Sequence, residues 1–199
     1  MKKIIFATNN EGKMKEIRMI LQDIGYTITS LKEAGIETEI VEDGKTFEEN
    51  AIIKANTIME LTGEIVLADD SGLEVDFMNK APGIYSARFL GEDTSYDKKN
   101  EYIIKQLKDV EQIDRSARFV CAIACAFPDG EVITKTATIE GYIGYEPRGE
   151  NGFGYDPIFC VPEFNCTTAQ LTMEQKNQIS HRSKALEAMK YEIRKRENQ

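Results

Sequence analysis

The sequence is poor in histidine, paired cysteines, long apolar runs and positive charge. It has one histidine, His181, and four cysteines with no Cys-x-x-Cys pair, so the spacing of a zinc site is absent. No stretch approaches the roughly 20 consecutive apolar residues of a membrane-spanning helix. Acidic residues outnumber basic ones by 34 to 25, and this net charge of -9 is opposite to that of a typical duplex binder. We therefore expect no membrane span and no nucleic-acid partner, although a small phosphorylated ligand needs only a local cationic pocket.

The cysteines and the N-terminus favour a reducing compartment. Cys121 and Cys125 lie in an apolar run, where cysteines are usually buried as small hydrophobic residues. The first seven residues resemble the apolar part of a signal peptide, but the run is short and ends at Asn9. We interpret 2–8 as a buried strand instead. Without a signal peptide, the cytoplasm is the expected location.

Helical periodicity recurs along the chain. Apolar residues at helical spacing predict helices over 14–24, 46–62 and 95–107. Thr46 and Glu49 match the pattern of a capping box at the start of the second helix. A C-terminal helix is also expected, with an apolar face and a charged tail in solvent. The residues of that face are Leu186, Met189 and Ile193, and the tail is Arg194-Lys195-Arg196.

The remaining apolar runs read as strands. A short buried strand is expected at 65–68, and two longer runs cover 117–127 and 131–143. Pro-Asp-Gly at 128–130 joins the two long runs, which is typical of a β-hairpin. Helices alternate with strands around one inserted hairpin, so the pattern predicts an α/β fold with a mixed sheet. No repeat or linker divides the chain, and we expect a single domain over 1–199.

A polar segment at 8–13, Thr-Asn-Asn-Glu-Gly-Lys, follows the first strand and opens a helix. A helix N-terminus offers free N–H groups and the positive end of a dipole, which together suit a phosphate. The segment nearly matches a P-loop, but Ala7 replaces the first glycine and Met14 replaces the Ser/Thr that holds magnesium. By themselves these residues fit a phosphate site and an Asn-rich capping turn with a solvated lysine equally well.

Asp69 and Asp70 follow a buried strand, at the position where open α/β sheets bind ligands. Two adjacent carboxylates cannot both be buried unpaired, and a divalent cation such as Mg²⁺ would compensate them. Because side chains alternate along a strand, only one of the two is expected to face the site. An acidic turn is the alternative. Glu42-Asp43 offers a further metal carboxylate, but its position before a helix equally fits an acidic loop.

Two motifs in the C-terminal third suit a flat base. Phe153 and Tyr155 lie in a glycine-rich segment and could stack on such a base, or they could be core aromatics of a tight turn. His181 and Arg182 could read the edge of a base, or the histidine could cap the last helix. A catalytic triad is disfavoured, because Ser180 adjoins the histidine and no Gly-x-Ser-x-Gly sequence exists.

In combination, these motifs resemble the inosine triphosphate pyrophosphatase family, also called dITP/XTP pyrophosphatases. The resemblance rests on 8–13, 68–76, 81–88, 153–159 and 180–182, in that order over almost the whole chain. It implies two lobes around a long mixed β-sheet, an active-site cleft between them, and a homodimer. It also implies a Mg²⁺-dependent enzyme that hydrolyses aberrant purine nucleotides (ITP, dITP and XTP) to the monophosphate and pyrophosphate, and so cleanses the nucleotide pool.

The resemblance assigns a role to each motif. Asp70 would be the acid/base residue and, with Glu42, a magnesium ligand. The triphosphate would be held by Thr8, Asn10, Lys13, Lys54 and Lys176. The rest of the nucleotide would contact Ser71, Phe153, Tyr155, Asp156, His181 and Arg182. Asn9, Glu11, Gly12 and Gly154 complete the substrate-binding motifs.

Donors from His181 and Arg182 would pair with the C6 oxygen of hypoxanthine or xanthine and clash with the C6 amine of adenine. This logic excludes ATP but not GTP, which also has a C6 oxygen. Two other interpretations stay open. One is a Maf-like nucleotide pyrophosphatase with another base preference, and the other is a nucleotide-binding sensor without turnover.

Overall fold

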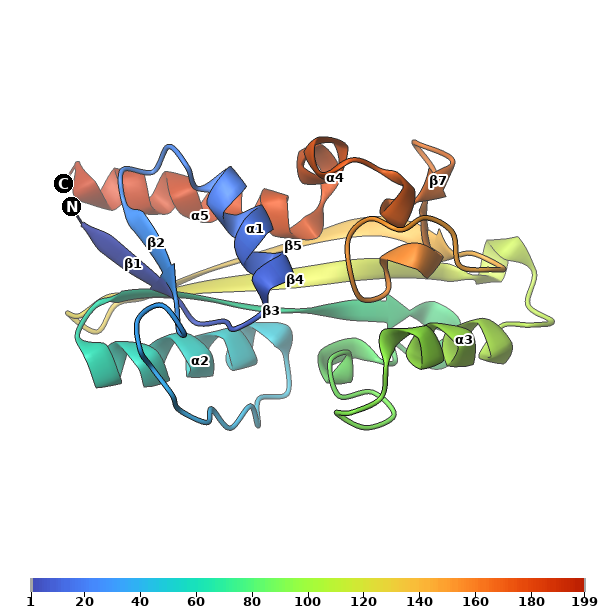
Figure 1. Cartoon of the computed structure of the whole chain (residues 1–199), viewed down its shortest axis with the longest axis horizontal. Coiled ribbons are helices and arrows are strands. Elements are labelled where there is room, and N and C mark those ends of the chain that lie inside the picture. Colours follow the sequence, from blue (N-terminus) through green and yellow to red (C-terminus); the bar gives the residue numbers. More distant parts are fainter. Residues whose placement is uncertain (1, 199) are drawn as a thin grey trace. The chain divides into compact units, whose positions relative to one another are not determined.

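The computed structural model describes residues 2–198 as helices packed on a mixed β-sheet (Figure 1). The strand order is β2-β1-β3-β4-β5-β6-β7. The strands are β1 (Lys3–Phe6), β2 (Thr27–Ser30), β3 (Ile65–Val75), β4 (Ser116–Ala126), β5 (Val132–Ile143), β6 (Phe159–Val161) and β7 (Cys166–Thr167). The α-helices are α1 (Glu11–Ile20), α2 (Phe47–Thr62), α3 (Tyr96–Gln106), α4 (Met173–Ile179) and α5 (His181–Glu197). The predicted α/β fold with a mixed sheet is confirmed.

The chain folds into two compact units. The first contains the residues up to 70, 121–137 and those from 181 onward, and the second contains 71–120 and 138–180. Strands β3, β4 and β5 each contribute residues to both units. None of the helices in the described part of the chain is long and apolar enough to cross a membrane.

In the first unit, β1 pairs in parallel with both β2 and β3. Helices α1 and α5 lie on one face of these strands and α2 lies on the other (Figure 1). The core beneath α1 and α5 joins Phe6 and Leu67, which are partners in register, to Ile17 of α1 and to Leu186 and Met189 of α5. The predicted apolar face of the C-terminal helix is therefore confirmed.

The four cysteines are free thiols. Cys121 and Cys125 are fully buried in the core of the first unit, as predicted. Burial raises the pKa of both thiols to about 12, so they stay protonated at neutral pH.

Helix boundaries follow local capping. Thr46 caps α2 by accepting a hydrogen bond from Glu49 N at 3.1 Å, but the Glu49 carboxylate accepts from Lys45 N at 2.6 Å. Only half of the predicted capping box therefore forms. Gly63 ends the helix with a φ of 67°, a conformation that favours glycine. Ser95 caps α3, which runs almost as predicted.

Several boundaries differ from the prediction. Helix α1 ends at Ile20, because the chain turns before Gly25. Strand β3 does not stop at 68 but continues to Val75, so Asp69 and Asp70 lie within a strand rather than in a turn. The C-terminal tail is not wholly in solvent either. The guanidinium of Arg196 pairs with Asp129 and Glu131 and lies 4.0 Å from the centroid of the Phe127 ring.

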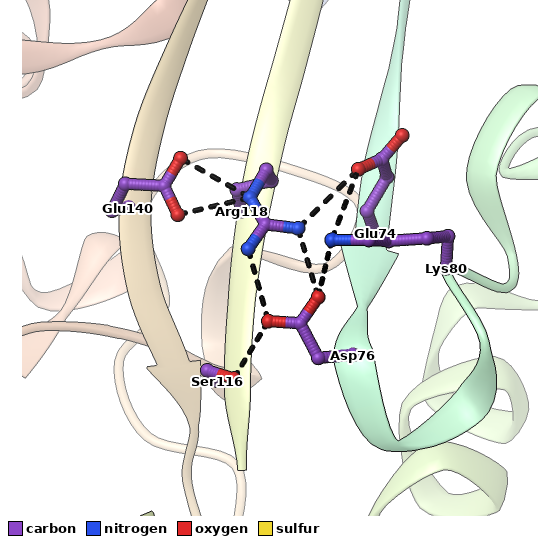
Figure 2. A network of polar contacts seen from close by, with 6 residues as sticks. All are labelled: Glu74, Asp76, Lys80, Ser116, Arg118 and Glu140. Carbon is purple, nitrogen blue, oxygen red and sulfur yellow. Dashed lines mark hydrogen bonds and ion pairs between the residues drawn. The ribbon is translucent and has the colours of Figure 1, made fainter. Parts of the chain in front are cut away.

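The second unit has its own core and a polar network across its strands. Helix α3 contributes Ile103 to a core with Leu73, Phe119 and Phe159. Arg118 of β4 binds carboxylates from the elements on either side (Figure 2). Its nitrogens lie 2.9 Å from Asp76, 3.4 Å from Glu74 and 2.9 Å from Glu140, and Ser116 and Lys80 also bind Asp76.

Candidate active site

The end of β1 and the middle of β3 bring two of the predicted motifs together in the first unit. The strands are parallel, with Phe6 opposite Leu67, and Ala7 N donates to Leu67 O at 2.7 Å. Thr8, just past the end of β1, therefore lies beside Asp69, although β3 itself continues to Val75.

The segment after β1 is built as a helix cap. Asn10 is the N-cap of α1, and its Oδ1 accepts from Lys13 N at 3.0 Å. Thr8 Oγ1 accepts from Asn10 N at 3.2 Å and shapes the turn. Glu11 and Gly12 form the first turn, whose N–H groups have no acceptor within a helix and suit an anion. The exposed residues of the segment are Asn9, Asn10 and Glu11.

Asp69 links the side chain of Lys13 to that of Arg182. Lys13 Nζ lies 2.8 Å and Arg182 Nε 3.5 Å from Asp69 Oδ2, and the guanidinium also pairs with Glu16. Apart from Lys13, the side chains of this group are almost fully buried: Glu16, Asp69, Arg182 and the neighbouring His181. Burial by itself would raise the pKa of Asp69, but the charges of Lys13, Arg182 and Lys54 outweigh it and hold the pKa well below its usual range. Lys13 is thus an ion-paired side chain rather than a solvated one.

Asp70 belongs to a separate group of side chains, which we call the Asp70 cluster: Glu42, Asn50, Lys54 and Asp70. Lys54 Nζ lies 3.0 Å from Glu42 Oε2 and 3.2 Å from Asp70 Oδ1. Asn50 Nδ2 donates to Asp70 Oδ2 at 3.2 Å. Burial and the nearby Glu42 charge raise the pKa of Asp70, although Lys54 and Asn50 oppose the shift. A buried carboxylate with a raised pKa suits proton transfer.

The two aspartates point to opposite faces of β3, as the alternation of a strand requires. Asp69 meets Lys13 of α1, whereas Asp70 meets Asn50 and Lys54 of α2. Helices α1 and α2 cover opposite faces of the strands (Figure 1). Asp70 and Glu42 therefore pair with the same ammonium, Lys54 Nζ. No group of three or more His, Cys, Asp or Glu side chains within the described chain is arranged to hold a metal by itself.

In the second unit, Asp156 organises the segment 153–156, which we call the Phe153 segment. Its Oδ2 accepts from Phe153 N at 2.9 Å and pairs with Lys176 Nζ at 2.7 Å. Its Oδ1 accepts from Thr168 Oγ1 at 2.8 Å. Lys176 Nζ also lies 4.9 Å from the centroid of the Phe153 ring. Gly152 has a φ of 75°, and a Cβ there would fall 2.2 Å from the Asp156 carboxylate.

The two aromatics of this segment differ in exposure. Tyr155 is buried, its hydroxyl donates to Ser86 O at 2.8 Å, and its ring meets Tyr96 edge-on at 5.2 Å. Phe153 is only half-buried, as is Ser71 at the start of the unit. Phe153 therefore offers the accessible ring, and Tyr155 supports the segment from within.

Comparison with known proteins identifies the family. The sequence profile of the Ham1 family matches residues 4–192. The chain belongs to the Ham1 family. Its relatives include proteins named dITP/XTP pyrophosphatase, so the family predicted from the motifs is confirmed.

The Ham1 relatives match this chain over nearly their whole length. The dITP/XTP pyrophosphatase of Bacillus licheniformis is 50% identical over 189 residues, which are 95% of this chain and 96% of the relative. The Bacillus subtilis protein of the same name is 48% identical, again over 95% of this chain and 96% of the relative. The Staphylococcus aureus Ham1 protein is similar in structure, with a TM-score of 0.88, 42% identity and coverage of 98% of this chain and all of that one.

Some residues around this Ham1 site were missed by sequence reasoning. Asn50 precedes Lys54 by one helical turn, and a polar residue within the apolar stripe of α2 was a usable signal. Glu16 interrupts the apolar face of α1 in the same way. Ser86 lay in the motif 81–88 but received no role, and Thr168 gave no signal, because each acts through contacts with a distant segment.

Proposed function

We propose that the chain hydrolyses the nucleoside triphosphates ITP, dITP and XTP to the monophosphate and pyrophosphate, and thereby removes them from the nucleotide pool. The proposal rests on the Asp70 cluster, in which a buried carboxylate contacts Asn50 and Lys54. The chain that carries this cluster is about half identical, over nearly its full length, to proteins named dITP/XTP pyrophosphatase. A cytoplasmic location and a homodimer, both implied by the motifs, belong to the same proposal.

In the proposed reaction, water attacks the α-phosphorus and pyrophosphate leaves. Asp70 takes a proton from the water. The free amides of the first turn of α1 and the side chains of Lys13 and Lys54 bind the phosphates. Their positive charge offsets the charge that develops on the leaving group.

We also propose that Mg²⁺ is the cofactor, held by Glu42 and Asp70. Both carboxylates reach the same ammonium, Lys54 Nζ, at 3.0 and 3.2 Å, so they converge on one point. Magnesium often takes only one or two carboxylates from the protein and completes its shell with phosphates and water. The residues therefore fit the ion, which when bound would supply positive charge beside the pyrophosphate.

Base recognition is assigned to the second unit and to the start of α5. Phe153 would stack on the purine, with Ser71, Gly154, Tyr155 and Asp156 completing that part of the site, whereas Lys176 is assigned to the triphosphate. His181 and Arg182 would donate to the C6 oxygen. Both are almost fully buried, and the Arg182 guanidinium also pairs with Glu16 and Asp69. Arg182→Ala should therefore lower kcat/KM for ITP. The ratio of kcat/KM for ITP to kcat/KM for ATP should fall by about tenfold if one donor is lost. An unchanged ratio would show that Arg182 does not read the base.

The experiment that tests the function is pyrophosphate release from a panel of ITP, dITP, XTP, GTP and ATP. We expect the first three to be preferred, and Asp70→Asn to lower turnover by about 10²–10⁴-fold. Tight ITP binding without pyrophosphate release would favour a sensor, and a preference for other bases would favour a Maf-like specificity. The match to the Ham1 family supports neither alternative.

A further inference from the structure

Helix α3 carries a buried polar residue, Asn100, that reaches the Phe153 segment. Asn100 is 2% exposed, and its Nδ2 donates to Gly154 O at 3.1 Å. The carbonyl can only accept, so this bond fixes which end of the amide faces the segment. The other end, Oδ1, is buried and has no hydrogen-bond partner within the described chain.

The unsatisfied Oδ1 indicates that Asn100 is not optimised for stability alone. A buried acceptor without a donor destabilises the fold, and an apolar side chain of similar shape would avoid that loss. The amide is therefore useful for its other end, the donor to Gly154. Buried unsatisfied groups of this kind need a specific explanation, and roles at functional sites are among the usual ones.

Neighbouring residues of α3 make Asn100 part of a platform under the Phe153 segment. Tyr96, one turn earlier, packs edge-on against Tyr155. Gly154 has a φ of 68°, and a Cβ there would meet the Tyr96 ring at 3.5 Å. Lys99 Nζ donates to Ala87 O at 2.6 Å and lies 4.8 Å from the centroid of the Tyr96 ring, so it steadies that ring.

The bond from Asn100 completes the anchoring of the segment. Asp156 holds its other end through Phe153 N and Lys176. Phe153 lies between Gly152 and Gly154, two glycines with positive φ that make the backbone on either side of it adaptable. Gly154 O, held by α3, belongs to the residue next to the half-buried Phe153.

We propose that Asn100 is a positioning residue for purine recognition, which sets the orientation of Phe153 through Gly154. The proposal rests on the proposed function. Asn100 belongs to the second unit, whereas Asp70 belongs to the first, so the effect should fall on base binding and not on the chemical step.

The test compares Asn100→Asp, which replaces the donor by an acceptor, with Ile103→Val on the same helix. Ile103 is fully buried in the core of the second unit, so the control loses packing on α3 but no hydrogen bond to the segment. For Asn100→Asp we expect KM for ITP to rise roughly tenfold, the loss of one hydrogen bond, with kcat nearly unchanged. The preference for ITP over ATP should change little, because a stacked ring does not distinguish the two purines. Ile103→Val should leave KM and this preference unchanged.

Inorganic triphosphate, used as a competitive inhibitor, isolates the part of the site that binds phosphate. Its inhibition constant should be the same in wild type and Asn100→Asp. Equal loss of triphosphate and ITP affinity, or a wild-type KM, would overturn the proposal. If Asn100→Asp does not fold, Asn100→Ala takes the same test, and failure of both to fold would mean a purely structural role. Wild-type protein that releases no pyrophosphate from ITP would instead refute the proposed function.

Discussion

Asp69 and Asp70 are adjacent and chemically identical, yet their surroundings move their pKa values in opposite directions. Burial acts on both and favours the neutral form. For Asp69 the charges of Lys13, Arg182 and Lys54 prevail and lower the pKa, whereas for Asp70 burial and Glu42 prevail and raise it. One carboxylate is therefore a permanent counter-ion, and the other is poised to exchange a proton.

Replacing each aspartate by asparagine should separate these roles. Asp69→Asn leaves Arg182 buried with one carboxylate fewer, and we expect a loss of about 3 kcal/mol in the free energy of unfolding. The raised pKa of Asp70 means that its ionised form is unfavourable in the folded state. The stability of the Asp70→Asn variant at neutral pH should therefore equal or exceed that of wild type.

Urea unfolding and pyrophosphate release measure the two effects. Turnover should fall much more in Asp70→Asn than in Asp69→Asn, which would act mainly through the position of Lys13. Wild-type stability in Asp69→Asn would contradict the counter-ion role.

At the scale of elements, helices with local capping signals were predicted well, whereas short strands that depend on long-range pairing were missed. Helices α2 and α3 were predicted because Thr46, Ser95 and Gly63 act within one turn of the helix ends. Strands β2, β6 and β7 have only four, three and two residues, too few for a period to appear, and their positions depend on pairing with distant strands.

The Arg118 network, which ties β3 and β4 to β5, gives a prediction about acid stability (Figure 2). Hydrogen bonds from Arg118, then from Lys80 and Ser116, hold the pKa of Asp76 well below its usual range. A carboxylate with a lowered pKa stabilises the fold above its unfolded pKa of about 4, and this contribution is lost as the pH falls toward the folded value.

Asp76→Asn should therefore lower the free energy of unfolding by about 1 kcal/mol at pH 7, in the range of partly exposed ion pairs. Below pH of about 4 the difference from wild type should shrink. Glu140→Gln is the matched control, because that side chain is 63% exposed and should matter less. Denaturant titrations across this pH range measure both, and a difference that grows in acid would refute the assignment.

At the scale of the whole molecule, the sequence located the motifs but not their partners. Asp69 and Asp70 stood out because two carboxylates follow an apolar run. Phe153 and Tyr155 stood out because two aromatic residues lie in a glycine-rich segment. The pairing of Arg182 with Glu16 joins residues 166 positions apart, and no local pattern encodes it. The bond from Asn100 to Gly154 was equally invisible, because an isolated asparagine on a helix resembles any solvated residue.

The last prediction concerns the whole protein without metal. Lys54 already pairs with Glu42 and Asp70 and offsets one of their two charges, so the fold of the Asp70 cluster does not rest on an ion alone. EDTA should therefore abolish pyrophosphate release while leaving the melting temperature unchanged, and Mg²⁺ should restore activity. Sodium chloride at matched ionic strength is the control, because general screening cannot replace a bound divalent ion. Full activity in the chelator would refute the magnesium assignment, and a marked fall in melting temperature would show that the ion supports the fold instead.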